Sequence, residues 1–244
     1  DFDKHGRNIV GKEGCSKILL LGLIRTDNPD ELRKAVLALR KEIAEDEYIR
    51  KIPSIKKTVR AFHAKDDCPE VREKFYKLIV KLNFKAEFFV ARKIESIFRS
   101  KHKAKQHLFY DDLIIKLFEN KLHKAERNFI YYAKRGNKTR QEPFEDAVQA
   151  AILTFENKWK QKVETETSVH PQTPSGEPCL QIIDYMNWTV FRAFSRGEER
   201  YYKFVEDKVS LLVDLYDFKK YKTYPENNYY SKRNTFAVNK ISPL

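Results

Sequence analysis

Several short apolar runs along the chain have the length of β-strands. The longest, Ser16 to Ile24 (SKILLLGLI), predicts a buried central strand, and its single Gly22 indicates close approach by a neighbouring backbone. Segments 58–63, 86–91 and 128–133 also have strand-like patterns. The sequence therefore predicts a sheet whose strands are separated by long connections.

Between and after these runs, apolar residues recur at helical spacing. Asn28 and Pro29 form a helix-start signal, and Pro69 and Pro143 each stand at a first helical position. Segment 170–178 (HPQTPSGEP) holds three prolines and a glycine, which predicts a loop. The helices predicted by this spacing cover 29–44, 69–82, 108–122, 143–160, 179–196 and 198–216.

Alternation of strands and helices predicts an α/β fold, with a mixed central sheet flanked by helices and additional helices toward the C-terminus. A chain of 244 residues does not require two cores, so we expect one domain over residues 1–217. The segment 218–244 is rich in Tyr, Asn and Lys, and we expect it to pack on the surface as a tail.

The chain is basic, with 48 Lys and Arg against 35 Asp and Glu, a formal net charge of +13. Residues 92–140 hold 14 basic and 5 acidic residues, so 14 − 5 gives +9 in this segment alone. Such an excess favours a polyanionic partner, DNA or RNA, although solvated helix faces are the alternative. The basic residues at predicted strand ends are candidates for phosphate contacts: Lys93, Lys134, Arg135, Lys138 and Arg140.

Other features narrow the class of protein. No apolar run approaches the roughly 20 residues that a membrane span needs, so we expect no membrane partner. The odd number of cysteines, none in CxxC spacing, predicts neither a zinc site nor a disulfide framework, and we expect a cytoplasmic protein. Tyr131 and Tyr132 alternate faces of one predicted strand, so one belongs to the core and the other is available to stack on a base, with core packing as the alternative for both.

A carboxylate stands out on the predicted helix 179–196. Asp184 shares a helical stripe with Leu180, Trp188 and Phe191, which predicts that it faces the core. A buried carboxylate needs a cation, a metal or a hydrogen-bond donor, and a structural salt bridge or loop cap is the alternative to a functional site. At the start of the chain, Asp1 and Asp3 share a face if they lie on a strand, and closely spaced carboxylates are the ligands that magnesium prefers.

In order along nearly the whole chain, six segments resemble the family called domain of unknown function 3800: DFDKHG, LLLGLI, FHAKDD, FFVARK, KRGNKTR and LQIID. That family's closing pattern, Leu-Gln-x-x-Asp, matches Leu180, Gln181 and Asp184. Its opening pattern, Asp-Glu-Ser-Gly, is replaced here by DFDKHG, in which Asp1 matches the leading Asp. The family is similar to RNase H, so the resemblance implies an RNase H-like fold with Asp1 and Asp184 as ligands of Mg²⁺ or Mn²⁺. Asp3 replaces a residue that is not acidic in the family pattern, so it is either a further ligand or simply exposed.

A two-metal site needs three or four carboxylates, and the segment FHAKDD offers His63, Asp66 and Asp67. His63 would orient a water or contact a phosphate, with a structural hydrogen bond as the alternative. Gln181, one turn before Asp184, would position that carboxylate or contact a phosphate, with the capping of a loop as the alternative.

Two functions are consistent with these residues. The first is a metal-dependent nuclease, in which bound carboxylates activate water and the basic segment holds the nucleic acid. The second is a non-catalytic nucleic-acid-binding subunit of a larger protein assembly, with an incomplete metal site. A plain protein-interaction domain leaves the basic segment and Asp184 without explanation.

Overall fold

The computed structural model describes residues 5, 7–134, 141–217 and 228–244. Its main sheet has the strand order β1-β2-β5-β6. β1 (Ile18–Arg25) runs antiparallel to β2 (Lys85–Arg92), β2 is parallel to β5 (Val209–Leu215), and β5 is antiparallel to β6 (Tyr229–Tyr230). The expected mixed sheet flanked by helices is confirmed.

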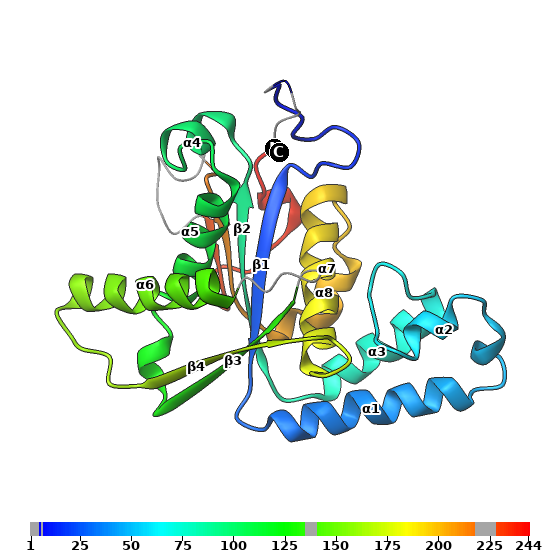
Figure 1. Cartoon of the computed structure of the whole chain (residues 1–244). Helices are drawn as coiled ribbons and strands as arrows, with labels where there is room; N and C mark the ends of the chain where they lie inside the picture. The colour runs from blue at the N-terminus through cyan, green and yellow to red at the C-terminus, as the bar shows by residue number, and fades with distance from the viewer. Residues whose placement is uncertain (1–4, 6, 135–140, 218–227) are drawn as a thin grey trace.

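Helices cover both faces of the main sheet (Figure 1). On one side lie α1 (Pro29–Glu45), α3 (Pro69–Lys81), α7 (Cys179–Arg196) and α8 (Arg200–Val205). On the other lie α4 (Glu95–Ser100), α5 (Gln106–Phe118) and α6 (Gln141–Trp159). None of the helices in the described ranges is both long and apolar enough to cross a membrane.

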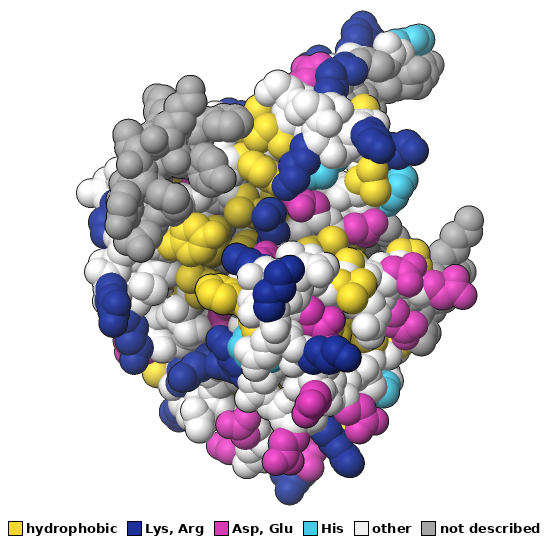
Figure 2. All heavy atoms as spheres, turned by 90° about the vertical axis from the view of Figure 1, so that its left-hand side faces the viewer, with side chains coloured by type: hydrophobic (Ala, Val, Ile, Leu, Met, Phe, Trp, Pro, Cys, Tyr) yellow, Lys and Arg dark blue, Asp and Glu magenta, His cyan; other side chains and the backbone are white. Residues whose placement is uncertain are grey.

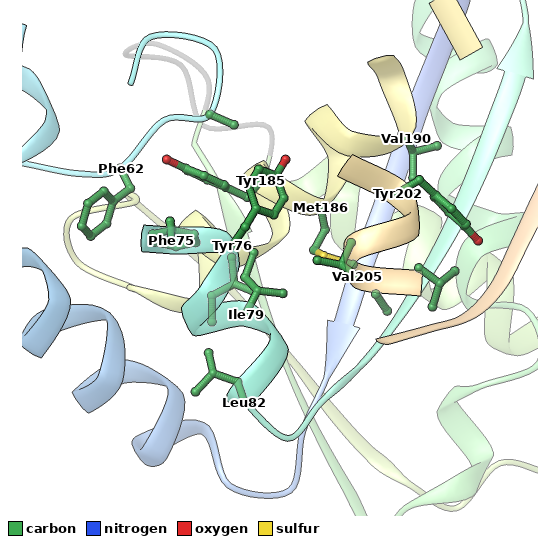
Figure 3. Close-up of a cluster of buried hydrophobic side chains, with 14 of the residues drawn as sticks. Phe62, Phe75, Tyr76, Ile79, Leu82, Tyr185, Met186, Val190, Tyr202 and Val205 are labelled. Carbon is green, nitrogen blue, oxygen red and sulfur yellow. The ribbon is translucent and has the colours of Figure 1, made fainter. Parts of the chain in front are cut away.

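β2 separates two hydrophobic cores because its side chains alternate between the faces of the sheet. Phe88 and Val90 are fully buried in the core with α3 and α7, whereas Phe89 and Ala91 belong to the core with α5 and α6. In the first core, Phe75 of α3 stacks on Tyr185 of α7 with ring centroids 4.0 Å apart (Figure 3). Tyr185 therefore packs deep in the molecule, where its hydroxyl needs a partner.

A second, two-stranded sheet crosses in front of the main sheet in Figure 1. It consists of β3 (Arg127–Ala133) and β4 (Glu166–Gln172), paired in parallel. The remaining elements are short and serve as connections: α2 (Ile55–Thr58) and the 3-10 turns Ile49–Lys51, Leu122–Lys124, Glu206–Lys208 and Val238–Lys240.

Local sequence explains where the long helices begin and end. The Asn28 side chain accepts a hydrogen bond from the Glu31 amide, and Pro29 occupies the first turn of α1. α7 ends at Gly197, which has a φ of +66° that favours glycine. The predicted helices 29–44, 69–82, 143–160 and 179–196 match α1, α3, α6 and α7 to within a few residues.

Two predicted elements are wrong. Segment 58–63 does not form a strand, because the amides of Phe62 and His63 donate to the side chains of Gln181 and Asp67 instead of to a neighbouring strand. The predicted helix 198–216 ends early at α8, and its second half is the strand β5. Pairing with β2 along its length overrides the apparent helical spacing of that segment.

Two further elements differ in their surroundings. β1 is an edge strand of the main sheet and not a central one. At Gly22 an added Cβ would lie 2.5 Å from Asn187 Oδ1, so the group that approaches this glycine closely is a side chain of α7 and not a backbone. β4 includes His170 to Gln172, from the segment expected to be a loop. An edge position tolerates Pro171 because its missing N–H need not bond a neighbouring strand.

The described part of the C-terminal segment contributes to the core as well as covering the surface. Tyr230 of β6 is 1% exposed and Phe236 is 2% exposed, and the two rings pack edge to face. Residues 228–244 therefore complete the main sheet and the core of the domain.

Candidate functional site

The first two turns of α7 hold the loop formed by residues 59–68. Gln181 is fully buried, its Oε1 accepts from the Phe62 amide at 2.9 Å, and its Nε2 donates to the Pro174 carbonyl at 2.6 Å. Both ends of its amide group are thus used by backbone. This matches the loop-capping alternative and leaves Gln181 away from any surface where it would contact a phosphate.

Asp184 and Tyr185 hold the same loop one turn further along. Asp184 Oδ2 accepts from the Ala64 amide at 2.9 Å, and the Tyr185 hydroxyl donates to Asp67 Oδ2 at 2.6 Å. Asp67 is 3% exposed and also accepts from the Thr58 hydroxyl and the His63 amide. The motif LQIID followed by tyrosine therefore fixes the conformation of FHAKDD by hydrogen bonds.

This loop places His63 between two carboxylates. Its Nε2 lies 3.9 Å from Asp184 Oδ1, and its Nδ1 lies 3.9 Å from Asp66 Oδ2. The side chains of His63, Asp184 and Asp66 are 54%, 36% and 59% exposed. Because 3.9 Å exceeds hydrogen-bonding distance, each carboxylate acts on the imidazole through its charge or through a bridging water. The predicted convergence of FHAKDD with Asp184 is present in the structure.

The Asp184 side chain is less buried than predicted from the apolar residues that share its face of the helix. Asp184 is half-buried and not fully enclosed in the core, with its side chain 36% exposed. Partial burial still raises the pKa of the Asp184 carboxyl above its ordinary value, and the nearby Asp67 and Asp66 raise it further. The Ala64 N–H and His63 oppose this rise in pKa.

Basic and aromatic side chains border the site. Arg72 of α3 donates to the Ala64 carbonyl at 3.4 Å, and its guanidinium lies 5.3 Å from the centre of the Trp188 ring. Arg192 lies 5.2 Å from the same ring, and Lys65 is exposed on the loop itself. This group of side chains was not predicted from the sequence, although Asp184, Trp188 and Arg192 stand at every fourth position of α7 and so share one face of the helix.

The described residues do not fit the expected magnesium site. Within those residues no three His, Cys, Asp or Glu side chains are grouped so as to hold a metal ion. Asp184 and Asp66 face opposite nitrogens of His63, so a single ion reaches only one of them together with the imidazole. Magnesium also prefers oxygen ligands to imidazole. Asp1 and Asp3, the other predicted ligands, lie outside the described residues.

The expected phosphate-binding residues do not gather at this site. The Lys93 amide donates a hydrogen bond to the Lys17 carbonyl, just before β1 begins. The first residue of α7 contacts Pro29, just after β1 ends. Lys93 and the start of α7 therefore lie at opposite ends of β1. Lys93 is partly buried, which lowers its pKa. Lys134 is exposed at the end of β3. Arg135, Lys138 and Arg140 lie outside the described residues.

The basic segment 92–140 does not form a single positive surface in the described ranges. On the side of α4, α5 and α6, Figure 2 shows Lys and Arg side chains interspersed with Asp and Glu. Arg92 is buried against Asp214 and Asp217. Others are ion-paired with acidic neighbours: Arg99 with Glu95, Lys101 with Asp112, Lys121 with Glu87 and Arg127 with Glu166.

The raised pKa of Asp184 gives a testable pH dependence of stability. Folding favours the protonated carboxyl, so the native protein loses this stability as the pH rises through the raised pKa. Asp184→Asn has no charge to bury, and its side-chain oxygen still accepts from the Ala64 amide. We expect the variant to melt at a higher temperature than the native chain at neutral pH.

The difference in melting temperature should vanish below pH 3.8, the ordinary pKa of the carboxyl, where both side chains are neutral. Scanning calorimetry across this range measures it. A variant that is less stable than the native chain at neutral pH would show that a cation stabilises the charged carboxylate.

Searches against family models, curated proteins and solved structures found no significant match to this chain, so the proposed function rests on the site alone.

Proposed function

We propose that this chain is a nuclease-like domain, with an RNase H-like arrangement, that acts on the phosphodiester backbone of nucleic acid. The observation that carries the proposal is the placement of His63 beside Asp184, two residues far apart in the sequence and both open to solvent. Arg72 donates to the Ala64 carbonyl of the same loop, and Lys65 is exposed on that loop two residues after His63, so both bring positive charge that attracts a polyanion.

The chemistry proposed for these residues is hydrolysis. His63 takes a proton from an attacking water, while the oxygen of that water forms a bond to phosphorus and the ester bond to the leaving oxygen breaks. Asp184 holds the imidazole by its charge and stabilises the imidazolium that forms. Lys65 and Arg72 neutralise charge on the phosphate, and the imidazolium returns its proton to the leaving oxygen.

Magnesium or manganese remains part of the proposal only as an expectation from the family resemblance. Asp184 is the one predicted ligand among the described residues, and Asp1 and Asp3 would have to supply the others. No step above passes through a metal ion.

The second candidate is a nucleic-acid-binding subunit of a larger assembly that does not cleave. It is favoured by the finding that, in the described ranges, no group of three metal-binding side chains exists. The two candidates make the same prediction for binding and opposite predictions for cleavage.

Cleavage of labelled RNA, DNA, duplex and hybrid, each with magnesium, manganese or a chelator, tests the proposal. We expect Asp184→Asn and His63→Ala each to lower the cleavage rate by roughly 100-fold or more. His107→Ala removes another exposed histidine and serves as the matched control, with cleavage unchanged. Equal rates for the native chain and both site variants would refute the site, and binding without any cleavage would establish the second candidate.

A further inference from the structure

The outward face of β3 carries aromatic side chains that are open to solvent. Phe129 is 62% exposed and Tyr131 is 38% exposed, whereas Ile130 and Tyr132 point inward. Tyr132 stacks on Phe144 of α6 with ring centroids 4.3 Å apart and planes 6° from parallel. Because side chains alternate along a strand, Tyr132 packs on the core while Tyr131 and Phe129 lie together on the solvent side.

β4 extends this face by a third ring. The parallel register places His170 beside Tyr131 and Ser168 beside Phe129. The His170 ring is 5.2 Å from Tyr131 and 6.3 Å from Phe129, with planes 28° and 22° from parallel, and Ser168 Oγ is 3.0 Å from His170 Nε2. Phe129, Tyr131 and His170 form what we call the aromatic face.

Positively charged residues stand at both ends of the strand that carries the aromatic face. Arg127 stands at the start of β3, and Lys134 is exposed just after its end. The side chains of Arg127 and its ion-pair partner Glu166 are 70% and 75% exposed, so the pair is weak and Arg127 can exchange that partner for a phosphate. Arg33 of α1 lies 5.5 Å from the centre of the Tyr131 ring. This arrangement complements a polyanion that carries flat, apolar groups.

The aromatic face is connected to the candidate site through the start of α7. Arg33 also forms an ion pair with Glu177, which accepts a hydrogen bond from the Cys179 amide at the first residue of α7. Gln181, two residues later, holds the loop that carries His63. The start of α7 therefore contacts both the aromatic face, through Arg33 and Glu177, and the loop that carries His63.

We propose that the aromatic face binds single-stranded nucleic acid, with bases stacked on Phe129 and Tyr131 and phosphates on Arg127 and Lys134. Every base has a ring face, so stacking holds a strand without depending on sequence. In a duplex these faces are already stacked on one another, so a flat sheet surface does not reach them. This inference rests on the proposed function, because it names the substrate class of the same protein.

The test measures binding of fluorescent oligo-uridylate and oligo-thymidylate, and of a duplex, to Asp184→Asn protein, and the length of each strand is checked after the measurement so that affinity is scored on uncut probe. We expect tighter binding of the single strands than of the duplex, and a loss of roughly tenfold in affinity for each of Phe129→Ala and Tyr131→Ala. Phe129→Trp should keep the affinity, since it keeps a ring. Trp159→Ala is the matched control, because Trp159 is 59% exposed beside Lys158 but lies at the end of α6.

Unchanged affinity in Phe129→Ala and Tyr131→Ala, or equal binding of duplex and single strand, would overturn the inference. Self-association that Phe129→Ala abolishes, without any effect on oligonucleotide binding, would show that the face binds protein and would also overturn it. The outcome is separate from the proposed function, since cleavage that does not depend on Asp184 refutes the site while stacking on the aromatic face is still measured by affinity.

Discussion

Replacing Arg92 with methionine is expected to lower the free energy of unfolding by about 3–5 kcal/mol. Arg92 is 8% exposed as a side chain and donates to both oxygens of Asp214, at 2.9 and 2.7 Å, and to Asp217 at 3.2 Å. Both carboxylates are essentially buried. Removing the guanidinium takes three charge-assisted hydrogen bonds away from these buried carboxylates, which costs far more than the methionine regains by packing.

The same guanidinium ties the C-terminal segment to the main sheet by donating to the carbonyls of Ser242 and Pro243 at 3.0 Å. Urea denaturation followed by circular dichroism measures the loss of stability. Arg99→Met is the matched control, because the Arg99 pair with Glu95 is exposed and should change stability by less than about 1 kcal/mol. Equal losses for the two variants would contradict the assigned role of Arg92. The double variant Arg92→Met with Asp214→Asn should recover part of the loss.

Replacing Asp67 with alanine is expected to lower the free energy of unfolding by about 4 kcal/mol. Asp67 accepts hydrogen bonds from the hydroxyls of Thr58 and Tyr185, both at 2.6 Å, and from the His63 amide at 2.9 Å. Thr58 is 3% exposed and Tyr185 is fully buried. Alanine leaves these donors without an acceptor, and each such loss costs about 1–3 kcal/mol, with incomplete additivity.

The Asp67 variant should also release the loop that positions His63, so amide exchange at Phe62 and Ala64 should accelerate together with the loss of stability. Asp66→Ala is the matched control, since that neighbour is 59% exposed and should change stability by no more than about 0.5 kcal/mol. Tyr185→Phe removes one of the three hydrogen bonds and should lose about a third as much as Asp67→Ala. Slow amide exchange in Asp67→Ala would show that the loop is held by other contacts.

Local sequence patterns predicted the helices and strands whose formation depends mainly on neighbouring residues. α1 and α3 were predicted from apolar spacing and from prolines in the first turn, α7 from apolar spacing, and β2 from the strand-like pattern of residues 86–91. β5 and β4 were missed because strands are stabilised by partners remote in sequence. Segment 58–63 has the composition of a strand, but side chains of α7 and of the loop itself take its amides.

The candidate site was also predicted from the sequence only in part. The sequence pointed to Asp184, Gln181 and the FHAKDD segment as residues that belong together, and the structure brings them into contact. Whether each one is buried could not be predicted from the sequence. Gln181 and Asp67 are buried and serve as hydrogen-bonding supports, while Asp184 and His63 remain accessible. The proposed roles of Asp1 and Asp3 stay predictions.

The sequence by itself determined the α/β class, the approximate start and end of α1, α3, α6 and α7, and the excess positive charge. These depend on spacing, capping and composition, which are properties of neighbouring residues. Only the tertiary structure decided that Arg92 is buried against two carboxylates and that Phe129 and Tyr131 lie exposed together. Burial depends on which distant element covers a side chain, and no local pattern contains that information.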